Sequence, residues 1–82
     1  MDKTKPSNTR QDLFRIKAYG LQELGQMYFP TSTPRSASAM LKKWIKRNPE
    51  LLASLTRAGY FNGQRILTPK QVRIIVEYLD PP

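Results

Sequence analysis

Apolar residues recur along this chain at the spacing of short amphipathic helices, separated by prolines, glycines and small polar residues. The clearest helix is predicted from about Arg35 to Arg47, where the apolar residues fall on one stripe at helical spacing. Asn48 and Pro49 end this helix, because the residue before a proline disfavours helical geometry. The same two residues begin another helix, as N-cap and first helical residue. The stripe consists of Ala37, Met40, Leu41, Trp44 and Ile45.

Three further helices are predicted around this one. Residues 21–29 form the first, which Gly25 weakens by up to about 1 kcal/mol relative to alanine and Pro30 ends. The helix that begins at Pro49 stops at Gly59, a residue typical of helix C-termini. The last helix begins at Thr68-Pro69-Lys70-Gln71, where threonine fits the N-cap and glutamine completes a capping box.

Two segments have the character of strands. Phe14, Ile16 and Ala18 alternate with polar or amphipathic residues, which predicts a short half-buried strand. Asn62-Gly63 lies within residues 60–67 and is the strongest short signal for a β-hairpin. A two-stranded hairpin alone is marginally stable, so we expect it to pair with the strand near Phe14.

These elements predict a mainly α fold: a small helix-turn-helix-like bundle of about four short helices, with a minimal β-hairpin as a rudimentary wing. The helix-turn-helix rests on the four-residue turn 31–34 between the first two helices. Residues 1–12 are predicted to be a flexible polar tail, and residues 13–82 a single domain. The predicted core comprises Leu21, Leu24, Tyr28, Met40, Leu41, Trp44, Ile45, Leu52, Leu55, Val72, Ile75, Val76 and Leu79.

Composition narrows the chemistry more than the fold. The 82 residues include no histidine and no cysteine, which excludes disulfides, Cys/His zinc sites and Ser-His or Cys-His catalytic pairs. Six acidic residues are few for carboxylate catalysis, and Ser38 with Lys42 lacks the oxyanion site that a Ser-Lys nucleophile needs. We therefore expect neither an enzyme nor a cofactor.

The net charge of +8 is concentrated in one element. The predicted helix over residues 35–47 carries five basic and no acidic residues, whereas the tail over residues 1–12 contributes only +1. At about 100° per residue, the basic and small residues fall opposite the apolar stripe. Such a face suits a groove whose phosphates the cations neutralise. The predicted site comprises Arg35, Ser38, Lys42, Lys43, Lys46, Arg47 and, beside the Asn62-Gly63 turn, Arg65.

Three interpretations of this face remain open from the sequence. A solvated outer face is common on amphipathic helices, but Lys42/Lys46 and Lys43/Arg47 are like-charged i,i+4 pairs that destabilise an isolated helix. Binding of duplex DNA explains why such repulsion persists. The alternative is a protein–protein adaptor that docks an acidic partner protein.

No run approaches the roughly 20 apolar residues of a membrane span, and the polar N-terminus lacks the apolar stretch of a signal peptide. The sequence therefore predicts a cytoplasmic protein without a membrane partner.

Several motifs resemble an uncharacterised family of small bacterial proteins, a domain of unknown function. Glu23-Leu24-Gly25, Tyr28-Phe29-Pro30 and the block from Leu41 to Leu51 carry the resemblance. Gly59-Tyr60 and the run from Arg65 to Val72, followed by residues 75–79, fit as well. The resemblance covers about Ile16 to Pro82 and implies no activity or site. The order of elements is similar, more loosely, to excisionase and MerR-type winged helix-turn-helix domains, which is an analogy of fold alone.

Overall fold

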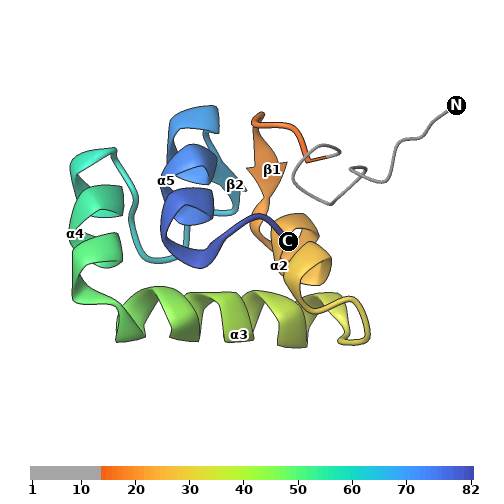
Figure 1. Cartoon of the computed structure of the whole chain (residues 1–82). Helices are drawn as coiled ribbons and strands as arrows, with labels where there is room; N and C mark the ends of the chain where they lie inside the picture. The colour runs from red at the N-terminus through yellow and green to blue at the C-terminus, as the bar shows by residue number, and fades with distance from the viewer. Residues whose placement is uncertain (1–13) are drawn as a thin grey trace, which may run out of the picture.

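The structure is a computed structural model that describes residues 14–82; the predicted tail lies outside the described residues. The element order is β1 (Tyr19–Gly20), α2 (Leu21–Tyr28), α3 (Pro34–Arg47), α4 (Pro49–Arg57), β2 (Ile66–Leu67) and α5 (Pro69–Leu79). This confirms the predicted fold class, a mainly α arrangement with four short helices and a minimal antiparallel pair of strands. Figure 1 shows α3 along one side of the molecule, with α2, α4 and α5 stacked against its other side.

Local side-chain caps define three of the helix starts. Thr33 Oγ1 accepts a hydrogen bond from the Ser36 N–H at 3.2 Å, and Pro34 is the first residue of α3. Asn48 caps α4 in the same way, through Leu51 N–H. The predicted capping box of α5 is present. Caps depend on residues within one turn, which is why the sequence predicts them well.

The strands differ from the prediction in position. Residues 14–18 form no strand, and β1 follows directly after them. Phe14 instead stacks on the ring of Tyr19 at 5.4 Å, and the Tyr19 hydroxyl donates to the carbonyl of Arg15 at 2.8 Å. The backbone bends to make these contacts, so Tyr19 is buried whereas Ile16 is exposed. Aromatic stacking therefore outweighs the period-2 pattern.

Asn62-Gly63 does form a tight turn, with Gly63 at φ +96°. Across the turn, Gln64 N–H donates to Phe61 C=O at 3.1 Å, but the flanking residues do not continue as a pair of strands. Tyr19 pairs with Leu67 and Gly20 with Ile66, so β2 takes its partner from the start of the described chain. The Gln64 side chain replaces the missing ladder: its Oε1 accepts from Phe61 N–H and its Nε2 donates to Ile66 C=O.

The core lies where α2, α4, α5 and the strand pair meet α3. Leu24, Leu41, Leu55 and Ile75 are fully buried within it, as predicted. The partly buried Tyr28, Leu52, Val76 and Leu79 pack against its edge. The complete set of buried apolar residues is Tyr19, Leu21, Leu24, Ala37, Leu41, Ile45, Leu51, Leu55, Leu67, Val72 and Ile75.

Met40 and Trp44 correct the predicted core, since each is 37% exposed. They lie at the edge of the apolar stripe of α3, whereas Ala37, Leu41 and Ile45 lie at its centre. The Trp44 ring packs edge-on against Phe29, at a centroid distance of 4.6 Å, and its other surroundings leave it partly in solvent. Trp44 is therefore not the central core anchor that its spacing predicts.

Helices α2 and α3 approach each other closely at Gly25. A Cβ atom at this position would lie 2.8 Å from the carbonyl oxygen of Ala37, closer than such atoms approach. The turn between these helices covers residues 29–33, slightly earlier than predicted, because Pro34 already belongs to α3. The close contact sets how α2 holds α3 against the body of the molecule.

Candidate nucleic-acid interface

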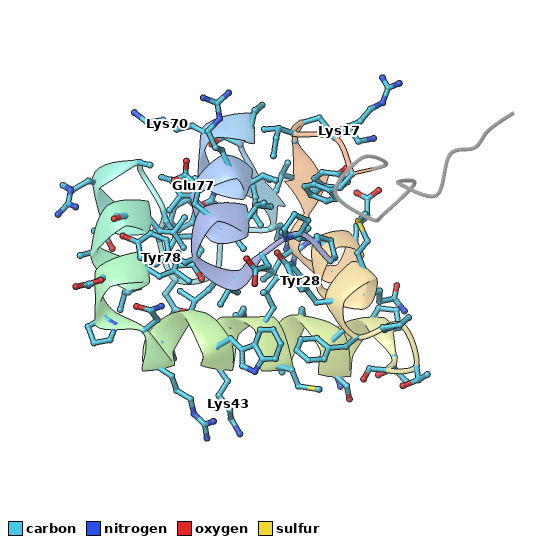
Figure 2. All side chains as sticks on the ribbon, in the orientation of Figure 1. Lys17, Tyr28, Lys43, Lys70, Glu77 and Tyr78 are labelled. Atoms are coloured by element: carbon cyan, nitrogen blue, oxygen red, sulfur yellow. The ribbon has the colours of Figure 1, made fainter. Side chains whose placement is uncertain are left out.

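Helix α3 carries five basic residues and no acidic residue, and its outer face is strongly basic. Ala37, Leu41 and Ile45 are fully buried, so the opposite side of the helix faces solvent. Lys43 points away from the body of the molecule in Figure 2. The helix contains no acidic residue, and Lys46 and Arg47 lie in its last turn, where the helix dipole favours cations.

The structure brings together six of the seven predicted site residues along a shallow groove on α3. Arg35, Lys43, Lys46 and Arg47 are exposed, whereas Ser38 and Lys42 are half-buried at one edge. Ala39 also lines the groove, and its small side chain keeps the middle of the face low. The lining residues are Arg35, Ser38, Ala39, Lys42, Lys43, Lys46 and Arg47.

Ser38 has a more limited role than the sequence suggests. Its hydroxyl lies 3.0 Å from the carbonyl oxygen of Arg35 and donates a hydrogen bond to it. The hydroxyl proton is therefore engaged within the helix. Ser38 contributes small size to the face, which permits close approach, and an oxygen that can accept.

Arg65 does not lie on the groove of α3. It lines a second pocket, formed between the edge of α3, the start of α2 and the segment before β2. Ser38 and Lys42 line this pocket as well as the groove. The complete lining consists of Gly20, Leu21, Gln22, Ser38, Lys42, Gly63, Gln64, Arg65 and Ile66.

The sequence does not indicate that Gln22 and Gly63 belong to this pocket. Gln22 follows the start of a helix and Gly63 occupies a turn, and each is fully explained by those local roles. Only the pairing of β1 with β2 brings the two segments beside Lys42. The signal that would reveal the pocket is therefore a long-range pairing rather than a motif.

A buried pair of glutamines holds the backbone around Arg65. Gln64 Nε2 donates to Gln71 Oε1 at 2.7 Å, and Gln71 Nε2 donates to the carbonyl of Ala58 at 3.2 Å. The Arg65 carbonyl accepts from Leu21 N–H at 2.7 Å. Because the buried polar groups of both side chains find partners, the network is rigid rather than costly.

Beside the basic groove lies a partly exposed aromatic cluster. Trp44 contacts Phe29 and Tyr28 edge-on, at centroid distances of 4.6 and 6.1 Å. Burial and, secondarily, the negative charge of Asp80 raise the pKa of Tyr28 well above its usual value. Its hydroxyl donates to the carbonyl of Asp80, which joins α2 to the end of α5.

Fold and surface define a small, mainly α domain with a basic outer helix. Residues 15–82 match the model of a family described as a domain of unknown function (DUF4248), and the chain belongs to this family. The match confirms the resemblance that the motifs indicate. No curated protein and no solved structure matches the chain.

In the described part of the chain, every helix is too short or too polar to cross a membrane.

Proposed function

We propose that this protein is a non-enzymatic module that binds duplex DNA through α3. The observation that carries the proposal is the outer face of α3, where five cations lie around a shallow groove without an acidic residue. Cations in such an arrangement neutralise phosphates and release counterions, which supplies most of the affinity for DNA. We further propose a cytoplasmic bacterial role, as a transcriptional regulator or an accessory protein of a mobile element.

In this proposal α2, the turn and α3 act as a helix-turn-helix, with α3 entering the major groove. The close contact of Gly25 with Ala37 supports it, because α3 is braced along its inner side while its outer face stays free. Ala39 and Ser38 allow the helix to approach base edges. The cations near the C-terminus of α3 then contact the phosphates.

The test is a series of binding measurements with mixed-sequence duplex DNA across salt concentrations. Neutralising about four phosphates should give a slope near −3.6 when log affinity is plotted against log salt. Lys46→Ala should make this slope less steep by about 0.9, because one contact is lost.

Lys70→Ala is the matched control for Lys46→Ala. Lys70 lies at the end of the molecule opposite to Lys43, so this variant should bind as the parent protein does (Figure 2). A parent protein that shows no salt-dependent binding at low ionic strength would refute the proposal.

One observation favours a second candidate function, an adaptor that docks an acidic partner protein. Trp44 and Met40 are each 37% exposed beside the basic groove, although binding of phosphates requires no apolar surface. Exposed aromatic residues next to cations suit a partner segment that carries acidic and apolar side chains. Capture of a partner that survives nuclease treatment would favour the adaptor, and loss of all captured material on nuclease treatment would favour DNA.

A further inference from the structure

The groove on α3 and the pocket beside Arg65 form one continuous surface. Ser38 and Lys42 lie one turn apart on α3 and line both depressions. A ligand that follows the groove across this edge of α3 therefore enters the pocket. The basic surface thus extends from the helix onto the segment that precedes β2.

The pocket presents positive charge from opposite walls. Lys42 comes from α3, and Arg65 comes from the segment next to the Asn62-Gly63 turn. No acidic side chain is among its lining residues. Glu23 is the carboxylate of the neighbouring first turn of α2, and it is engaged with the N–H of Gly20 at 3.2 Å.

The size of the pocket suits a ligand larger than a single phosphate group. Its volume of about 510 Å³ exceeds what a single phosphate group fills and lies in the range of ligand pockets. Gly20 and Gly63 contribute no side chains to its walls, and a Cβ at Gly63 would meet no atom within 4 Å. The main chain at Gly63 is therefore accessible to a ligand.

The wall that carries Arg65 is held in place before any ligand arrives. The backbone carbonyl of Arg65 accepts a hydrogen bond from Leu21 N–H, and the side chain of the neighbouring Gln64 donates one to Gln71 Oε1. Arg65 itself is exposed, so its guanidinium is free to reach a ligand from a fixed backbone. Such preorganisation lowers the entropy lost on binding.

We infer that this pocket holds a backbone phosphodiester of the same duplex that α3 binds, between Lys42 and Arg65. The inference rests on the proposed function and extends it. It assigns Arg65 to a phosphate at the border of the DNA major groove, whereas α3 lies in the major groove itself. A free phosphate compound shares the chemistry, but the continuity of the pocket with α3 favours the duplex.

The test compares Arg65→Ala with Arg57→Ala in the duplex binding series. Arg57 lies on α4 and lines neither depression, which makes it the matched control. Loss of one phosphate contact removes a factor of about eight in affinity at 0.1 M salt and about 0.9 from the slope. This loss should be the same for all duplex sequences, and Arg65→Lys should restore the slope, since it keeps the charge.

The outcomes separate this inference from the proposed function. If the parent binds duplex DNA and Arg65→Ala binds as tightly as Arg57→Ala, the pocket assignment is wrong and the role of α3 stands. If the parent itself does not bind, both fail. The remaining alternative, a free phosphate compound, is tested by titrating the protein with inorganic phosphate and following its backbone amide signals. Saturable shifts at Gly63, together with unchanged duplex affinity of Arg65→Ala, would overturn the duplex in favour of a free phosphate compound.

Discussion

Tyr28 shows how one side chain links distant parts of this fold. Its hydroxyl donates to the carbonyl of Asp80 at 2.5 Å, while its ring contacts Trp44. Burial disfavours the ionised form, and the carboxylate of Asp80 disfavours it further, so the pKa of Tyr28 is raised. The spacing of apolar residues places Tyr28 in the core, but it gives no sign of the hydroxyl's partner.

This raised pKa predicts a loss of stability in alkaline solution. The unfolded chain releases the Tyr28 proton near pH 10, whereas the folded chain still holds it. The stabilisation from protonated Tyr28 is therefore complete below about pH 10 and declines as the pH rises above it. Urea unfolding at several pH values between about 8 and 11.5 measures the decline.

Tyr28→Phe should flatten this pH dependence, at the cost of the hydrogen bond to Asp80. Burial also raises the pKa of Tyr60, which leaves a smaller slope in that variant. Tyr60→Phe should remove only the smaller part of the pH dependence that Tyr60 contributes. An equal slope in the parent and in Tyr28→Phe would contradict the assignment.

At the scale of elements, α2 and α3 approach each other so closely at Gly25 that a Cβ atom does not fit between them. Gly25 faces the backbone of Ala37, which cannot move aside as a flexible side chain can. From the sequence alone, Gly25 is only a residue that weakens its helix. Its reason lies in the partner helix.

Gly25→Val should therefore destabilise the protein by about 1–3 kcal/mol, because the larger side chain forces α2 away from α3. Ala39→Val is the control, since Ala39 is exposed on the outer face of α3 and its substitution adds comparable volume there. Urea midpoints of both variants provide the measurement. A Gly25 variant as stable as the control would show that the two helices separate at little cost.

The helices were predictable in position, whereas for the strands only the approximate pairing of the two segments was predictable and their exact residues were not, for a physical reason. Helix starts depend on caps such as Thr33 and Asn48, whose partners lie three residues away. The strand pair depends on Gly20 meeting Ile66, and nothing in the local pattern at either residue specifies the other. The basic face of α3 was predictable for the same reason as the helices, whereas the pocket beside Arg65 was not.

At the scale of the whole molecule, the net charge of +8 works against the compact state. Much of it is gathered on α3, although Lys17 and Lys70 lie at the opposite end of the molecule from Lys43 (Figure 2). Repulsion along α3 lowers stability, and we expect a bound polyanion to relieve it. The free protein is therefore less stable than the same fold would be without this repulsion.

Lys42→Glu tests this balance, because its effects on stability and on binding should have opposite signs. The new carboxylate faces Lys46 one turn on, which replaces repulsion by attraction and adds a few tenths of a kcal/mol to stability. Binding of duplex DNA should weaken, since a phosphate contact is lost. Thermal unfolding and the binding series measure the two effects. A rise in both stability and affinity would place the binding surface elsewhere.

The pairing of Tyr19 with Leu67 also bears on the order of events in folding. Most of the helix contacts join neighbours along the chain, which meet quickly because the intervening loops are short. The two-residue strand pair must close a loop that contains three helices, and its few hydrogen bonds do not offset that entropy alone. We therefore expect it to form after the helices have packed, which makes the pocket beside Arg65 one of the last features of the molecule to appear.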